Sequence, residues 1–190
     1  MSIRFVFDLQ KTIAALAFLA EREKGNLNMF LSIKMLYLAD KKALASWGKT
    51  ITGDKMVSMP KGPVLSTVYD LFKGVGTAQN LKEWNFYFGE TVNNAIQVRQ
   101  HPDIELLSED ERAALDAARE EIESVAPWEV AKWLHESCPE WEDPHGSSRS
   151  IDPAVILRNA GHSEDEIKMI EDSADTFKQL DKVFCGLAGH

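Results

Sequence analysis

Apolar and polar residues along the chain form several stretches with helical spacing, separated by short turns that contain glycine or proline. The first stretch predicts a helix that Asp8 caps and Gly25 ends, because its apolar residues recur every three to four positions. The second stretch begins after Asn28 and is apolar at almost every position from Met29 to Ala39. A helix that is apolar on all sides needs neighbours all round, so we expect this helix at the centre of the fold.

Capping signals mark two later helices. The segments Ser108–Glu111 and Ser163–Glu166 each place a serine three residues before a glutamate, which is the pattern of a capping box. We expect the helices that begin there to end near Ser124 and Phe184.

Prolines predict the start of three shorter helices. Proline fits the first turn of a helix, where its missing N–H is not needed. Pro63 therefore predicts a helix that runs to about Lys73 and is closed by Gly74. Pro127 and Pro153 predict two more helices.

Strand-like spacing occurs in two places. Met56–Met59 lies between two turns and has room for one short strand. Large aromatic residues alternate over Trp84–Phe88, and Ile96 and Val98 repeat that spacing after a turn, which predicts a β-hairpin. A lone hairpin is only marginally stable in water, so we expect its aromatic face to pack on the helices.

These elements predict a mainly α, helix-dominated α+β fold: a single helical domain with a small antiparallel β-hairpin or sheet. A chain of 190 residues has an ordinary single-domain length, and no repeat or change of composition divides it. We therefore expect one domain over 1–190, with a core over about 5–160 and a C-terminal helix over about 163–184.

The composition is that of a folded protein with an acidic surface. Apolar residues make up 44% of the chain and charged residues 27%, and the formal net charge is -9. An acidic excess disfavours a nucleic-acid partner, because nucleic acid is bound by clustered Lys and Arg. The best basic cluster contains no arginine, and we interpret it as a solvated surface: Lys41, Lys42, Lys49, Lys55 and Lys61.

Cysteine usage and hydropathy indicate a cytoplasmic protein. Cys138 and Cys185 stand far apart and form no disulfide framework, so we expect both thiols to be reduced. No unbroken apolar run reaches the ~18 residues that a membrane span needs, and the start of the chain lacks the basic segment and cleavage site of a signal peptide. We expect no membrane partner.

Patterns that would indicate catalysis or a cofactor are weak. The chain has no phosphate-binding loop, and Gly74–Gly76 lacks the third glycine of a dinucleotide fingerprint. His135, Cys138 and His145 lie close in sequence, but the second ligand pair of a structural zinc site is missing. Cys138 and His135 could pair as nucleophile and base, yet no orienting third group is identifiable. We therefore predict no catalytic residue, no metal and no cofactor.

Four segments carry motifs in a fixed order. Lys34–Asp40 (KMLYLAD) ends the central apolar run, Trp47–Asp54 (WGKTITGD) forms a loop, and Lys61–Val64 (KGPV) and Val68–Asp70 (VYD) follow. Together they resemble the signature of the Panacea domain, the family of SocA-like antitoxins and phage-associated GepA-like proteins. The resemblance covers most of the chain, about 5–160.

The resemblance implies an antitoxin of a toxin–antitoxin pair. In this family a cognate toxin protein is neutralised by direct contact, and some members hand the toxin to a cytosolic protease. The resemblance implies no catalysis, cofactor or metal, and no nucleic-acid partner is expected. The family-motif positions, which shape the loop or the partner surface, are Tyr37, Asp40, Thr52, Gly53, Asp54, Gly62, Pro63, Val64, Tyr69 and His135.

Two alternatives stay open. The protein could be a protease adaptor that delivers a toxin for degradation, or a small-ligand-binding protein or enzyme with a pocket near Asp40, Asp54 and His135. Because a domain that serves many toxins cannot fix its specificity in its most recurrent residues, we expect the toxin-contacting surface in the predicted hairpin or the last helix. The sequence specifies neither the toxin nor the oligomeric state.

Overall fold

The computed structural model describes residues 3–187. Its helices in that range are α1 (Leu9–Glu21), α2 (Met29–Trp47), α3 (Ser66–Phe72), α4 (Ala78–Tyr87), α5 (Glu109–Glu123), α6 (Val130–Ser137), α7 (Pro153–Asn159) and α8 (Glu164–Leu187), with a 3-10 turn η1 (Ile104–Leu106). The strands are β1 (Asn26–Asn28), β2 (Met56–Met59), β3 (Gly62–Leu65), β4 (Ala95–Gln97) and β5 (Arg149–Ser150). The predicted helix-dominated α+β fold is confirmed. No helix in the described range combines the length and apolar character needed to cross a membrane.

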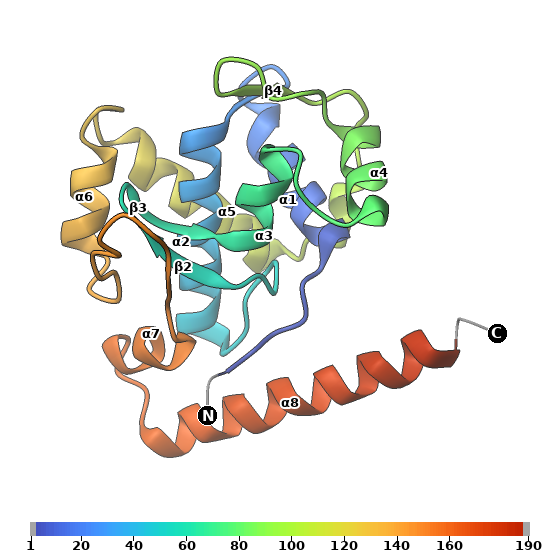
Figure 1. Cartoon of the computed structure of the whole chain (residues 1–190). Coiled ribbons are helices and arrows are strands. Elements are labelled where there is room, and N and C mark those ends of the chain that lie inside the picture. The colour runs from blue at the N-terminus through green and yellow to red at the C-terminus, as the bar shows by residue number, and fades with distance from the viewer. Residues whose placement is uncertain (1–2, 188–190) are drawn as a thin grey trace.

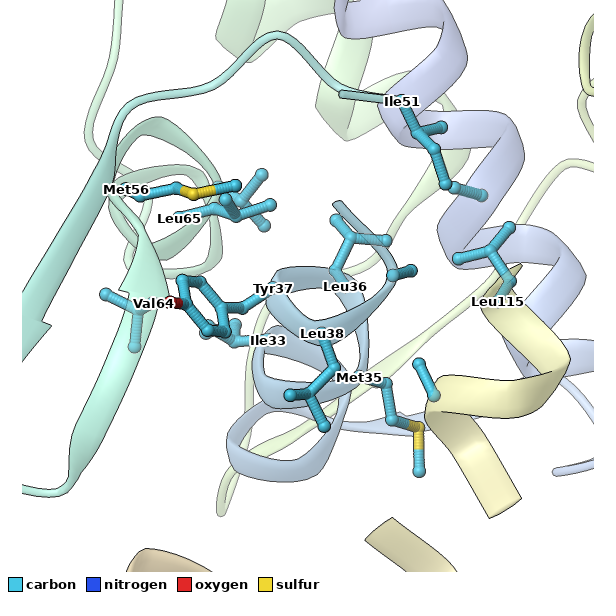
Figure 2. Packing of buried hydrophobic residues seen from close by; sticks show 14 of the residues in the cluster. Ile33, Met35, Leu36, Tyr37, Leu38, Ile51, Met56, Val64, Leu65 and Leu115 are labelled. Carbon is cyan, nitrogen blue, oxygen red and sulfur yellow. The ribbon is translucent and has the colours of Figure 1, made fainter. Parts of the chain in front are cut away.

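The apolar helix α2 is the centre of the molecule, as its sequence predicts. It packs on α5, on β3 and on α7, and it also contacts α1 and β1 (Figure 1). Figure 2 shows Ile33 and Tyr37 pointing toward Val64 in the β2–β3 hairpin, whereas Met35 points toward α5. Burial of one such side chain stabilises the fold by roughly 1.5–3 kcal/mol. Because α2 packs on the hairpin at one side and on α5 at the other, it organises the core from both sides.

Local capping signals set most helix boundaries. Asp8 caps α1 by accepting a hydrogen bond from the Lys11 N–H at 2.9 Å. Both predicted capping boxes form, at the starts of α5 and α8. The end of α2 is set by Gly48, which adopts the left-handed conformation at φ 69°.

Two small antiparallel sheets lie beside α2. In the three-stranded sheet β2 is central, with β3 and β5 at its edges. β2 and β3 form a tight hairpin in which Met56 pairs with Leu65 and Met59 with Gly62. The prediction that Pro63 begins a helix is wrong: Pro63 lies in the edge strand β3, where a residue without an N–H is tolerated, and α3 begins at Ser66.

The predicted hairpin over Trp84–Val98 is also wrong in its first half. Trp84 and Phe86 lie in α4, and Trp84 packs on Phe88 one turn later, with ring centroids 4.5 Å apart. A short run of aromatic residues satisfies both strand spacing and an i, i+4 helical pair, and here the helical pair is buried while Phe86 is 59% exposed. β4 exists, but it pairs with β1, and Phe88 reaches Val98 only through an isolated bridge.

Candidate functional site

Asp40 holds the start of the motif loop, which runs from Thr50 to Asp54. Its buried side chain accepts hydrogen bonds from the Ile51 N–H at 2.8 Å, from the Thr52 N–H at 3.0 Å and from the Thr52 hydroxyl. Burial raises the pKa of Asp40 to about 7, although these hydrogen bonds favour the charged form. Asp40 therefore fixes backbone N–H groups and presents no surface to a ligand.

Asp54 connects the motif loop to α3. One carboxylate oxygen accepts from the Lys55 N–H at 2.7 Å and the Thr67 N–H at 3.1 Å, and the other accepts from the Val68 N–H at 2.9 Å. Leu65, at the N-cap of α3, offers no side-chain hydrogen bond. Asp54, which lies in an earlier segment of the chain, thus supplies the acceptor that the start of α3 lacks. Burial raises the pKa of this carboxyl group.

Gly53 lets the start of the chain pass directly over the motif loop. It has a φ of +67°, and a Cβ atom there would lie 1.8 Å from the carbonyl oxygen of Val6. Next to this contact the Asp8 N–H donates to the Thr52 carbonyl oxygen at 2.8 Å. No side chain fits at Gly53 unless the N-terminal segment moves away.

The turn of the β2–β3 hairpin contacts α2 and α6. Gly62 has a φ of +95°, and a Cβ atom there would lie 3.2 Å from the Cβ of Leu134. The Pro63 carbonyl accepts a hydrogen bond from the buried Nζ of Lys34 at 2.7 Å, and Val64 is buried behind it. These motif residues bring the hairpin close to the helices.

Tyr37 binds a glutamate that sequence reasoning missed. Its hydroxyl donates to Glu140 Oε1 at 2.6 Å, and Lys41 Nζ lies 3.0 Å from Oε2 of the same carboxylate. The Glu140 side chain is fully buried, so this charge depends on both partners. Burial first, and the nearby carboxylate second, raise the pKa of Tyr37. Glu140 stands in a loop with no pattern that would reveal its burial.

His135 stacks on Trp141 and does not act as a base for the Cys138 thiol. The two rings are 3.7 Å apart and nearly parallel at 12°, and Trp141 Nε1 donates to the Met59 carbonyl at 2.9 Å. Burial raises the pKa of the Cys138 thiol to about 12, which disfavours the thiolate that a nucleophile or zinc ligand needs. His145 is exposed. Among the residues whose side chains the structure describes (3–181 and 183), no three His, Cys, Asp or Glu side chains gather around a common metal position.

The motif residues therefore form two clusters at opposite ends of β2. Asp40 and Asp54 lie before the strand, whereas His135 packs through Trp141 at Met59. Met59 lies five positions after Asp54, which corresponds to roughly 16 Å of extended chain. Asp40, Asp54 and His135 do not converge on one pocket. Tyr69, in α3, is half-buried, with Lys73 Nζ 4.9 Å from its ring.

The helix α8 carries the most exposed run of apolar side chains. It lies along one side of the molecule, next to the N-terminal segment (Figure 1). Its inner face buries Ile167 and Ala174. Other apolar residues of the same helix are exposed: Met169 by 71%, Phe177 by 68%, Leu180 by 47% and Val183 by 58%.

A groove of about 660 Å³ separates α8 from the motif loop. Met169 and Phe177 line one side, and the other side contains Val6 and Trp47, which are 40% and 38% exposed. Lys49 and the motif loop, through Thr50, Ile51 and Gly53, complete the wall opposite α8. The groove therefore places exposed apolar residues of α8 opposite the motif loop.

The family model described as "Antitoxin SocA-like, Panacea domain" matches residues 33–142, which is more than half of the chain. The match contains the motif loop, the hairpin turn and His135, and it ends before α7 and α8. No curated protein and no solved structure matches the chain. The chain belongs to the SocA-like antitoxin family and contains its Panacea domain.

Proposed function

We propose that the protein is an antitoxin that neutralises a cognate protein toxin by direct contact, through α8 and the groove beside it. The observation that carries this proposal is the exposed apolar face of α8, formed by Met169, Phe177, Leu180 and Val183. Contiguous exposed apolar surface is typical of interaction sites. α8 also lies outside the segment that the family model matches, where toxin-specific contacts are expected.

Charge supports a basic partner for this surface. α8 has more acidic than basic residues, the acids being Glu164, Asp165, Glu166, Glu171, Asp172, Asp175 and Asp181, and the bases Lys168, Lys178 and Lys182. A toxin that presents an apolar strip between Lys or Arg residues would match both features, and the acidic field would speed its association. The same acidic charge disfavours a nucleic-acid partner. In the lysine cluster, Lys42 is already paired with Glu121 at 2.5 Å, so its charge is partly neutralised.

Direct neutralisation needs no protease, whereas the adaptor alternative does. The neighbouring gene of the operon is expressed alone and together with this protein, in hosts with and without the main cytosolic proteases. We expect rescue of growth in both hosts. Rescue only in the host that has the proteases would indicate an adaptor, and a harmless neighbour would remove that gene product as the toxin. We also propose that the protein acts in the cytoplasm. We further propose that it folds as one domain over 1–190.

The surface is tested by removing apolar contacts from α8. The double variant Phe177→Ser, Leu180→Ser is expected to weaken toxin binding at least ~30-fold, since two buried anchors of an interface contribute about 1–2 kcal/mol each or more. Trp128→Ser is the matched control, because Trp128 is 83% exposed and lies outside α8 and the groove. Calorimetry with purified toxin measures both. Equal affinity in the two variants would place the toxin surface elsewhere.

A further inference from the structure

A second pocket lies on another part of the molecule, between the first turns of α2 and the β2–β3 turn. Its volume is about 420 Å³, within the range of small-ligand sites. Most of its walls are apolar, formed by Met29, Phe30, Ile33, Met59, Val64 and Tyr69. Its charged lining residues are Lys34 and Lys61, and no acidic side chain lines it. In a chain of net charge -9, this local excess of positive charge is unexpected.

Lys34 is an unusual lysine because it is buried and incompletely paired. Only 2% of its surface is exposed. An ammonium group has three N–H donors, and the structure gives Lys34 Nζ one hydrogen bond, to the Pro63 carbonyl at 2.7 Å, and a cation–π contact with the Phe30 ring, whose centroid is 5.6 Å away. Within the described part of the chain, Lys34 makes no ion pair with a carboxylate. A buried cation without a counter-charge is unfavourable, so the pocket beside it is a favourable place for an anion.

We propose that this pocket binds a carboxylate group carried on an apolar body, with Lys34 as its counter-ion. The aromatic rings of Phe30 and Tyr69 suit an apolar or aromatic body, and two N–H groups of Lys34 remain for the carboxylate. A phosphate group suits the pocket less well, because phosphate is usually held by several donors from Arg or backbone N–H groups. The chemistry is shared by the C-terminal residue of a polypeptide and by a free apolar acid.

The charge state of Lys34 makes the binding depend on pH. Burial lowers the pKa of Lys34 to about 7. The groups that face it are Lys61 from the hairpin turn, Tyr69 from α3 and Cys138 after α6, and the Cys138 thiol is neutral at this pH because its pKa is raised to about 12. Since a carboxylate stays charged above pH 6, affinity is expected to fall as the pH rises from 6.5 to 9.

The test uses the isolated full-length protein and three probes. N-acetyl-L-phenylalanine represents a polypeptide end, 3-phenylpropanoate represents a free acid, and N-acetyl-L-phenylalanine amide is the uncharged control. We expect at least one acid to bind in calorimetry at pH 6.5, and the amide to bind at least 10-fold more weakly. Tighter binding of the acetylated acid supports a chain end as ligand, and equal or tighter binding of 3-phenylpropanoate supports a free acid.

The variant Lys34→Met keeps the length of the side chain and removes its charge. It is expected to lose at least 10-fold in affinity for the acid, whereas Lys55→Met, which changes a lysine outside this pocket, is expected to bind as the wild type does. If Lys34→Met does not fold, the comparison of acid with amide and the loss of affinity at pH 9 still test the proposal on the wild type. Absence of binding by both acids at 10 mM, or equal binding of acid and amide, overturns it. Toxin neutralisation is not needed for either result.

Discussion

The motif loop and α8 distribute polar and apolar groups in opposite ways. The loop contains the buried carboxylate of Asp54 and covers that of Asp40 from α2, and both carboxylates accept hydrogen bonds from backbone N–H groups. α8 exposes Phe177 and neighbouring apolar side chains to solvent. Burying a polar group costs little free energy when the group is hydrogen-bonded. An exposed apolar group, in contrast, contributes favourable free energy only when a partner covers it. This contrast supports the proposal that the shared motif is a scaffold and that the unmatched helix contacts the partner.

The largest expected effect comes from Gly53→Ala in the motif loop. The added Cβ cannot coexist with the Val6 carbonyl oxygen at 1.8 Å, so either the loop or the N-terminal segment must move. We expect the free energy of unfolding to fall by more than ~3 kcal/mol, which is in the range of severe backbone strain and lost packing. Urea denaturation followed by circular dichroism measures the change.

Gly74→Ala separates backbone strain from the clash. Gly74 has a similar φ of +71°, but a Cβ atom there meets nothing within 4 Å. Its substitution should cost only the left-handed conformation, roughly 1–2 kcal/mol. Equal losses in the two variants would show that the contact with Val6 contributes nothing.

The next effect is a pH dependence that belongs to Asp40. Its pKa is raised from 3.8 to about 7 in the folded protein, so the folded state binds the proton more strongly than the unfolded state. The stability due to this group is complete below pH 4 and is lost as the pH rises through 7. Asp40→Asn cannot ionise, and its free energy of unfolding should rise relative to the wild type between pH 4.5 and 7.5.

The control for that measurement lies in α8. Asp172→Asn removes an exposed carboxylate, so it measures how the loss of one surface charge affects stability over the same pH range. Urea titrations at the two pH values provide the comparison. If Asp40→Asn and Asp172→Asn behave alike, burial does not control the ionisation of Asp40.

The smallest expected effect is on the stability of α8 itself. Phe177→Ser should change the free energy of unfolding by less than ~0.5 kcal/mol, because an exposed side chain loses little on substitution. Ile167→Ala, on the inner face and 5% exposed, should cost about 2 kcal/mol. Thermal and urea denaturation of the isolated protein measure both. A large loss for Phe177→Ser would mean that this side chain serves the fold and is not held in reserve for a partner.

Local signals predicted much of the fold, and distant contacts explain what they missed. The caps at Asp8 and Ser108 act within four residues, so the sequence alone reveals them. Trp84–Phe88 misled because five residues carry both strand and helical spacing. Pro63 fits an edge strand as well as a helix start, and the choice depends on pairing with β2.

The site shows the same limit. The sequence placed the motif residues through a family resemblance, but it could not reveal which of them meet. Tyr37 and Glu140 are 103 positions apart, and Lys34 is 29 positions from the carbonyl that it binds. Such contacts depend on how helices and hairpin pack, which no local spacing records. The sequence pointed to the last helix as a possible partner surface, but it did not show which of its apolar residues stay exposed, because Ile167 and Phe177 fit the same helical spacing.

The passage of the N-terminal segment over Gly53 bears on how modular this domain is. The segment shared with the family begins at residue 33, yet the loop at its heart is covered by Val6 and tied to Asp8. The limit of similarity is therefore not the limit of the folding unit. A chimera that exchanges 33–142 between two relatives must also exchange the segment around 6–8, because this segment and the loop have to fit each other.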